Sequence, residues 1–468
     1  MRLFSISMAP VLLAGFALAP RGAAKTALYP GPEGMQPSEL YQVKVNGAPS
    51  FVYPVTVNPT GEYQNISGPG AMTYFDFEGE VTVEITASRE VASASVHPLS
   101  RGVKAAVHGR AVTFTLTAPG NFVLFFDGSR NEPLFVFANP IETEVPDRDA
   151  PGVFYFGPGV HSPGLIELGS NQTLYLAGGA FVKGRIKSDD AQNVKILGRG
   201  ILYGGGYRKE DVGGDKFVMF RNCQEARVEG IILLDAFGWN MMIAGSRNVT
   251  VDNVKIIGWR MNSDGINPVS SEDVVIRNCF IKSQDDGISI KGMAAAGERL
   301  RNITITNCVM WQNWMRSFVL GGELTVKSTE NIVFRDSDII YSGVNLKSAG
   351  NRDAALSVWN VDAGLARDVL FEDIRVEEAV RLVRLALFKN KHSRQPEWGH
   401  IDGVTFRNIT VLKGPAAIEL SGHSETNLTQ NVTFENLEIE GKLIRGPEDL
   451  SAYSADPFTR NVKFAVTR

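Results

Sequence analysis

The side chains best suited to chemistry are three aspartates in and beside two Asp-Gly-Ile triplets. The triplets begin at Asp264 and Asp286, separated by 286 − 264 = 22 residues, and Asp285 directly precedes the second one. If this interval is one turn of a solenoid, the triplets are neighbours in space, one coil apart. We therefore expect the three carboxyl groups on one small patch, an arrangement rarely needed for structure alone.

Three carboxyl groups in a groove can supply what the hydrolysis of a glycosidic bond requires. One group must stay protonated to donate to the leaving oxygen, and crowding by like charges raises its pKa. Another must be ionised to activate a water molecule, and a separation of about 6.5–9.5 Å leaves room for that water. Because Asp285 and Asp286 are adjacent, an ideal strand would point them to opposite faces, so we expect a bend or bulge there. The structural alternative is a row of solvated corner residues, since Asp before Gly is common in turns.

Residues that begin successive strands extend this patch into a predicted ladder. Coils of a parallel sheet lie about 4.8 Å apart, so residues in equivalent positions stack. The ladder consists of Asn240, Asp264, Asp286, Arg316 and Asp353. Around the catalytic candidates Asp264, Asp285 and Asp286, the predicted substrate-binding residues are Asn240, Asn262, Lys291, Arg316, Glu323 and Asp353, together with Trp239 and Trp314, whose rings could stack on sugars.

A repeated strand in the C-terminal two thirds of the chain predicts the scaffold. Each copy has apolar residues at alternate positions, closes on Asn or Asp, and is followed by a short second strand. The seven copies begin at Val249, Val274, Ile303, Ile332, Val369, Val404 and Val432. Asn and Asp tolerate the left-handed conformation of a sharp corner, and stacked Asn side chains can hydrogen-bond along the axis. Strand repeats without helices indicate a parallel β-helix, with loops of varied length such as 343–352 and 389–403 walling a groove.

The N-terminal part of the chain has a different pattern. Residues 25–150 contain short alternating runs between Gly, Pro and Asn turns, typical of a small antiparallel β-sandwich. The predicted organisation is therefore all-β, with this sandwich followed by a β-helix over residues 151–468. Residues 1–24 have the basic start, apolar run and small residues of a signal peptide, so we expect a secreted or periplasmic protein.

Composition limits the partners. A net charge of −4 and a pI near 6.0 argue against a nucleic-acid binder. No histidines have a metal-binding spacing, so we expect neither a metal nor a cofactor. Two of the three cysteines, Cys279 and Cys308, fall at equivalent repeat positions, which favours a buried ladder over disulfides. The expected partner is a polysaccharide or oligosaccharide, and a capped solenoid is expected to be monomeric.

Two motifs give the chain a resemblance to known families. The sequences Asn262-Ser-Asp264 and Asp285-Asp286 resemble the N-x-D and D-D motifs of glycoside hydrolase family 28, the polygalacturonase family. The N-terminal sandwich and the passages at 154–160 and 174–183 resemble family 49, the dextranase and isopullulanase family. The resemblance implies an inverting hydrolase in which Asp285 is the general acid, and Asp264 and Asp286 hold and activate water. Where family 28 has G-H-G, this chain reads Met315-Arg316-Ser317, and Asn345-Leu-Lys347 echoes the family's R-I-K motif.

Two other functions remain open from the residues. A polysaccharide lyase would use Arg316 or Lys291 as the base, with Ca²⁺ bound by the aspartates. A non-catalytic carbohydrate-binding solenoid would keep its binding when the aspartates are replaced.

Overall fold

A computed structural model of the chain describes residues 24–58, 65–343 and 353–467. The predicted signal peptide, apart from Ala24, lies outside the described residues, as does Lys347. Within the described ranges the chain forms 44 strands and four short 3-10 turns. None of these helical turns is long and apolar enough to cross a bilayer. The all-β prediction is confirmed.

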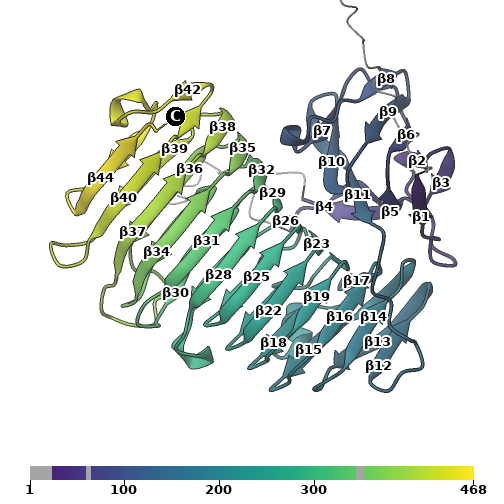
Figure 1. Cartoon of the computed structure of the whole chain (residues 1–468), viewed down its shortest axis with the longest axis horizontal. Coiled ribbons are helices and arrows are strands. Elements are labelled where there is room, and N and C mark those ends of the chain that lie inside the picture. The colour runs from purple at the N-terminus through teal and green to yellow at the C-terminus, as the bar shows by residue number, and fades with distance from the viewer. Residues whose placement is uncertain (1–23, 59–64, 344–352, 468) are drawn as a thin grey trace, which may run out of the picture.

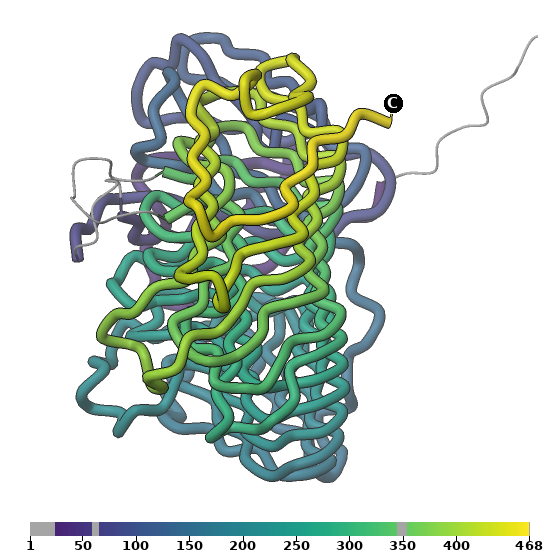
Figure 2. Tube along the Cα trace, turned by 90° about the vertical axis from the view of Figure 1, so that its left-hand side faces the viewer, coloured from purple at the N-terminus to yellow at the C-terminus, as the bar shows by residue number. Residues whose placement is uncertain are grey.

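Strands β12 (Val153–Phe156) to β44 (Thr459–Ala465) wind into a right-handed parallel β-helix whose coils stack along one axis (Figures 1 and 2). One side is a sheet of 12 parallel strands. It includes β22 (Arg247–Asp252), β25 (Glu272–Arg277), β28 (Arg301–Thr306) and β31 (Glu330–Arg335). The predicted alignment of the repeats is confirmed, because Val249 pairs with Val274, Val274 with Ile303, and so on through all seven copies.

The coil corners follow the predicted chemistry. The seven Asn or Asp residues that close the repeated strands all have φ between 48° and 57°. Their side chains stack, as where Asn307 Nδ2 donates to Asn278 Oδ1 at 2.7 Å and Asn436 Nδ2 donates to Asn408 Oδ1 at 2.9 Å. Cys279 and Cys308 are buried and free. Backbone bonds also join the corners of successive coils, as where Asn253 N–H donates to the carbonyl oxygen of Arg277 at 3.0 Å, so the corner contacts help to hold the register.

A second sheet of 21 strands covers the other two sides of the solenoid, which we call the docking face and the site face. The docking face includes β20 (Ile232–Leu234), β23 (Lys255–Ile257), β26 (Phe280–Ser283), β29 (Val309–Gln312) and β32 (Asp338–Ser342). The site face includes β18 (Val218–Arg221), β21 (Met241–Ala244), β24 (Ile266–Val269), β27 (Ile288–Gly292), β30 (Phe318–Leu324), β33 (Leu356–Asn360) and β36 (Arg381–Leu387).

Two small sheets form the N-terminal sandwich. The first contains β1 (Lys25–Leu28), β4 (Tyr53–Val57), β5 (Gly68–Glu78), β7 (Ala94–His97), β10 (Gly120–Phe126) and β11 (Ser129–Pro140). The second contains β2 (Tyr41–Val45), β3 (Ala48–Ser50), β6 (Val81–Ala87), β8 (Ala106–His108) and β9 (Ala111–Leu116). Pairing is antiparallel as predicted, except that β5 and β11 are parallel.

The sandwich stands beside the N-terminal half of the solenoid (Figure 1). Its first sheet shares an apolar core with the docking face, in which Phe135 and Phe125 pack on Trp311, and Phe137 packs on Phe280. A buried ion pair joins Arg199 of the solenoid to Asp76 of the sandwich at 3.0 Å. The sandwich thus packs on a different side of the solenoid from the site face.

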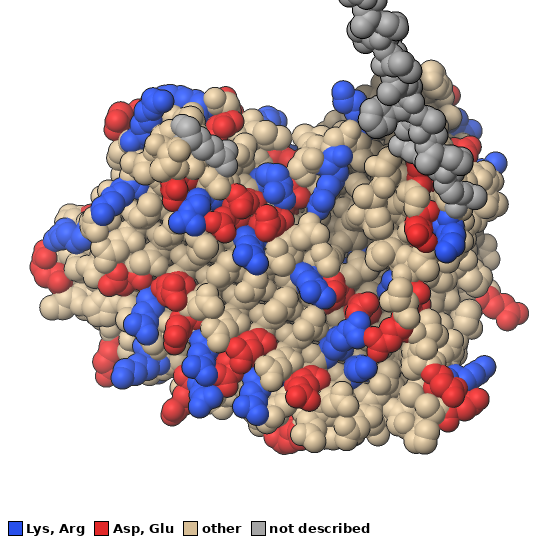
Figure 3. Space-filling model, in the orientation of Figure 1, with Lys and Arg blue, Asp and Glu red and all other residues tan. Residues whose placement is uncertain are grey.

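The outer surface of the 12-stranded sheet carries intermingled basic and acidic side chains (Figure 3). Arg277, for example, pairs with Asp252 at 2.7 Å, and Arg407 pairs with Glu372 at 2.8 Å. The face seen in Figure 3 therefore has no extended patch of one sign.

Candidate active site

The catalytic candidates lie at the corners where the chain passes from the docking face to the site face. Asp264 lies between β23 and β24, Asp285 and Asp286 between β26 and β27, and Arg316 between β29 and β30. Consecutive coils thus present these side chains at one edge of the solenoid, as the repeat predicts.

A bend allows the two adjacent aspartates to share the site. Residues 284–287 separate β26 from β27, and Ser283 Oγ lies 3.1 Å from the carbonyl oxygen of Asp285 and 3.2 Å from that of Asp286. The amide of Asp286 donates to Asp285 Oδ1 at 2.9 Å. The predicted break in the strand is confirmed, and it turns both carboxyl groups toward the same groove.

The glycine of each triplet is required by the stacking of the coils. A Cβ on Gly265 would lie 2.3 Å from the carbonyl oxygen of Gly287. A Cβ on Gly287 would lie 2.3 Å from Met310 Cε and 2.6 Å from the carbonyl oxygen of Ser317. All three distances are shorter than real Cβ contacts, so only glycine lets the aspartate corners stack so closely.

Strand register corrects the two ends of the predicted ladder. Met241 pairs with Ile266 and Ile266 with Ile288, so Trp239, not Asn240, is level with Asp264. A shift of one residue turns a side chain to the other face. Asn240 is accordingly fully buried, and its Nδ2 donates to the carbonyl oxygen of Asp264 at 3.0 Å.

At the other end of the ladder, the register displaces Asp353 by one position. Phe318 pairs with Leu356, so Ala354, not Asp353, is level with Arg316. Asp353 nevertheless reaches the site, because it lies within ion-pair distance of the Arg316 guanidinium.

A groove of about 1140 Å³ runs over these corners. Of the residues predicted from sequence, the groove is lined by Trp239, Asn262, Asp264, Asp285, Asp286, Lys291, Arg316, Glu323 and Asp353. Asn240 and Trp314 are not part of the lining. Asn240 supports the backbone under the groove, which corrects its expected position on the groove surface.

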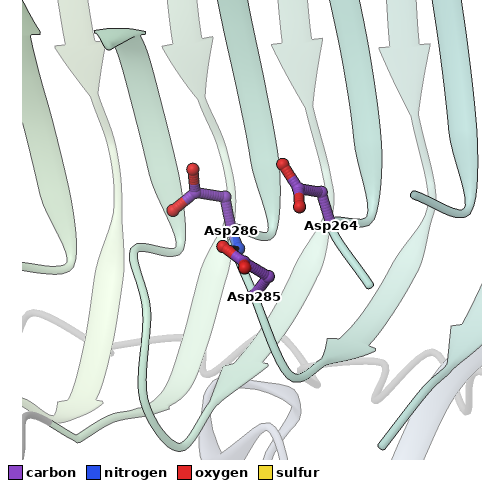
Figure 4. Close-up of side chains that lie close together, drawn as sticks. All are labelled: Asp264, Asp285 and Asp286. Atoms are coloured by element: carbon purple, nitrogen blue, oxygen red, sulfur yellow. Dashed lines mark hydrogen bonds between the residues drawn. The ribbon is translucent and has the colours of Figure 1, made fainter. Parts of the chain in front are cut away.

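The three aspartates form a tight cluster. One carboxylate oxygen from each lies within 4.8 Å of the other two. Figure 4 shows the carboxylates of Asp264 and Asp286 side by side on neighbouring coils, with that of Asp285 offset at the bend. The nearest oxygens are closer than the 6.5–9.5 Å expected for an acid and a base with water between them. The spacing is thus shorter than the one expected, although the bend sets Asp285 apart from the stacked pair Asp264 and Asp286.

Burial and like charges set the protonation of Asp264. This residue is 2% exposed, and burial, followed by the charge of Asp285, raises its pKa well above the ordinary carboxyl value, although Lys291 opposes the shift. Its Oδ2 accepts a hydrogen bond from Asn267 Nδ2 at 3.4 Å, while its Oδ1 has no protein partner within the described ranges. The raised pKa favours a protonated carboxyl group at Asp264 within the cluster, whereas the resemblance implies that Asp285 is the acid.

Two basic side chains balance the cluster. Arg316 Nη1 lies 2.7 Å from Asp286 Oδ1, and the guanidinium lies 4.0 Å from the centre of the Trp359 ring. Burial works against the charge of Arg316, but Asp286 and Asp353 outweigh it and raise its pKa. Lys291 Nζ lies 3.4 Å from Glu323 Oε2. Its pKa is also raised, because Glu323 and Asp264 outweigh the effect of burial.

The carboxylate cluster also has the spacing to hold a divalent cation through oxygen ligands. Lys291 and Arg316, however, already place two positive charges beside these carboxylates. The protein's own side chains thus already offset the negative charge of these carboxylates.

Sequence reasoning missed several groove residues because they lie in loops without motifs. Lys209 comes from the turn Lys209–Val212 between the coils, and its Nζ contacts Asn262 Oδ1. Arg384 comes from β36, and Phe388 and the segment 390–392 follow that strand. The loop over 389–403 was expected to wall the groove, and its first residues do so. Excess loop length was the available signal, but it does not specify which side chains face inward.

Comparison with known proteins agrees with the architecture and the motifs. Residues 165–450 match the family model described as glycosyl hydrolases family 28. A probable polygalacturonase of Arabidopsis thaliana is 22% identical over 236 residues, which cover 49% of this chain and 50% of the relative. The exopolygalacturonase B of Aspergillus niger is 23% identical over 228 residues, covering 41% and 50%. The chain thus spans about half the length of these curated relatives.

Solved structures show the same fold. Dex49A from Penicillium minioluteum matches with a TM-score of 0.59 over 94% of this chain and 96% of that chain, at 17% identity. The family 28 exopolygalacturonase of Yersinia enterocolitica matches with a TM-score of 0.54 over 87% and 98%, at 13% identity. The predicted resemblance to family 28, with features of family 49, is confirmed.

Proposed function

Because this chain belongs to glycosyl hydrolases family 28, we propose that it cleaves the O-glycosidic bonds of a polysaccharide or oligosaccharide, with inversion at the anomeric carbon. The observation that carries the proposal is the cluster of three aspartates, on two stacked coils, in a groove of about 1140 Å³. Its relatives are named polygalacturonases and exopolygalacturonases, so pectic polymers are the first substrates to test, with dextran beside them.

In the proposed mechanism, Asp285 donates a proton to the leaving oxygen and Asp264 and Asp286 hold the water that attacks the anomeric carbon. The position of Asp285, offset at the bend, supports this division of roles. Arg316 Nη1 lies 2.7 Å from Asp286 Oδ1 and so places a positive charge beside the carboxylate that is assigned as the base. The raised pKa of Asp264 favours one shared proton in the cluster, which binding of a water or sugar hydroxyl would redistribute.

The electrostatics disfavour the lyase alternative. A lyase base must be able to accept a proton from the sugar ring. Lys291 and Arg316 have raised pKa values because carboxylates surround them, so both stay protonated near neutral pH. The remaining alternative is a solenoid that binds carbohydrate without cutting it. Measuring turnover distinguishes this alternative from a hydrolase.

The role of Asp285 is tested by replacing it with Asn. Reducing ends released from polysaccharide are expected to fall by a factor of about 10² or more, because Asn cannot donate the proton. An aryl glycoside whose leaving group needs no protonation should lose much less activity in the Asp285→Asn variant, whereas Asp286→Asn should lose activity on both substrates. Asp273→Asn, an exposed corner with φ of 56°, is the matched control and should retain full activity.

Equal losses on the two substrates for Asp285→Asn would move the acid role to another aspartate. Proton NMR of the first product tests inversion directly, because an inverting enzyme releases the opposite anomer from that of the bond it cuts. Release of unsaturated ends with ultraviolet absorbance would refute hydrolysis.

We also propose that the protein is secreted or periplasmic and works as a monomer. Cell fractionation with N-terminal sequencing of the mature protein tests the location, with cleavage near Ala24 as the expected result. Light scattering tests the oligomeric state. Full-length protein in the cytoplasm or a stable dimer would contradict these proposals.

A further inference from the structure

The basic side chains deepest in the groove are already neutralised by carboxylates of the protein. Arg316 is 8% exposed, pairs with Asp286 and Asp353 through its two terminal nitrogens, and covers one face of Trp359. Neither terminal nitrogen is thus left as an isolated charge for an anionic substrate. A planar guanidinium binds carboxylates best through such a fork, and here the protein itself fills it.

The same compensation recurs at the next cations. Lys291 is 5% exposed and pairs with Glu323. Arg384 pairs with Glu419 at 3.5 Å and stacks on Phe388. Each of these cations has a carboxylate partner outside the three catalytic candidates, either Asp353, Glu323 or Glu419. These three partners have no evident part in the cleavage, and they cancel the charges that would attract an acidic sugar.

Asp or Glu side chains and Lys or Arg side chains line the groove in equal numbers. Among the residues that line it, five carboxylates (Asp264, Asp285, Asp286, Glu323 and Asp353) face five basic side chains (Lys209, Lys291, Arg316, Arg384 and Lys391). Lys209 and Lys391 lie exposed at the rim, where a charge in water contributes little to binding. A uronate beside Arg316 and Lys291 would be desolvated among several carboxylates and would have to compete with Asp353 and Glu323 for these two cations, which is unfavourable.

We propose that the groove selects a neutral glycan over a polyuronate, and that Asp353 and Glu323 enforce this selection by neutralising Arg316 and Lys291. The inference rests on the proposed hydrolase function and narrows its substrate class. It is a case of specificity obtained by repelling the wrong ligand as well as by binding the right one.

The test uses two polymers that differ only in charge. Polygalacturonate and its carboxyl-reduced form have the same backbone and linkage, and dextran provides a second neutral polymer. We expect the wild type to have a kcat/KM at least about tenfold higher on a neutral polymer than on polygalacturonate, which corresponds to about 1.4 kcal/mol. The Asp353→Asn and Glu323→Gln variants each expose one cation, so each should shift this ratio by about tenfold toward polygalacturonate. Glu372→Gln, which removes a carboxylate from an ion pair on the outer sheet, should leave the ratio unchanged.

Binding separates failure of this inference from failure of hydrolysis. Affinity electrophoresis of the Asp285→Asn variant in gels containing each polymer ranks the two charge classes without turnover. Stronger retardation by neutral polymers supports the inference even if no polymer is cut, while absence of cutting overturns the hydrolase. Equal or faster hydrolysis of polygalacturonate, or preferential binding to it, overturns the inference and leaves the hydrolase standing. If the protein neither binds nor cuts any of the polymers, both the inference and the hydrolase function are overturned.

Discussion

Replacing Asp264 by Asn is expected to abolish activity and yet to stabilise the folded protein at neutral pH. Burial and the neighbouring carboxylates raise the pKa of Asp264, so the folded chain holds this proton more tightly than the unfolded chain. The contribution of Asp264 to the free energy of unfolding is therefore greatest below the ordinary carboxyl pKa of about 3.9, and it is lost as pH rises through the folded pKa. Asn has the shape of the protonated acid and does not ionise, so the variant escapes this loss.

The size of the effect follows from the geometry of the cluster. Two like charges at the 4.8 Å that bounds the oxygen separations repel by about 3.5 kcal/mol at an effective dielectric of about 20. Attraction by Lys291 offsets part of this repulsion. Asn keeps an oxygen that can accept the hydrogen bond from Asn267, so little is lost in exchange. We expect the variant to gain about 1–3 kcal/mol at pH 8.

Urea unfolding of the wild type and the variant, at pH 5 and pH 8 in matched ionic strength, measures this gain. The difference in stability should grow with pH, and Asp273→Asn should show no such trend because Asp273 is an exposed corner. A variant that is less stable than the wild type at pH 8, or a difference that is independent of pH, would refute the reasoning. Either result would mean that repulsion between the carboxylates does not destabilise the folded protein.

Two further predictions concern residues that support the site. Burial lowers the pKa of Lys282 to about 7, well below the value of about 10.4 in an unfolded chain, so its contribution to stability improves as pH rises between these values. Lys282→Met should therefore stabilise the protein by about 1–4 kcal/mol at pH 6–7, and the gain should shrink toward pH 10 in urea unfolding; a constant gain would contradict this explanation. Gly287→Ala should cost about 1–3 kcal/mol and reduce kcat, because the added Cβ would meet Met310 and the backbone of Ser317. Gly206→Ala is the control, because its Cβ would have no neighbour within 4 Å. Equal stability of the two variants in thermal unfolding, and equal activity in reducing-end assays, would show that coil stacking does not position Asp286.

The compensation of charge in the groove has a structural consequence. Cations such as Arg316 and Lys291 make a crowded set of carboxylates tolerable in a buried position. We expect the same pairs to leave Arg316 and Lys291 little free charge for a substrate, so the electrostatics that permit the aspartate cluster are also expected to restrict the sugars that bind beside it.

The amino-acid sequence by itself determined the repeat, its corners and the catalytic cluster. Alternating apolar residues closed by Asn or Asp specify a strand and a left-handed corner locally, and their recurrence specifies stacked coils. Because stacking brings residues one repeat apart into contact, Asp264 and Asp286 could be placed together, and the adjacency of Asp285 and Asp286 required the bend that is found at 284–287.

Only the tertiary structure decided which face each neighbouring side chain presents. A side chain changes face with a shift of one residue, so Trp239 occupies the ladder position that was expected for Asn240, although the strand itself was located correctly. Loop conformations likewise brought Lys209 and the segment after Phe388 into the groove, although no repeated sequence pattern predicts their positions. The pairing of Arg316 with Asp353 arises from contacts between separate coils, and local sequence carries no information about that charge balance.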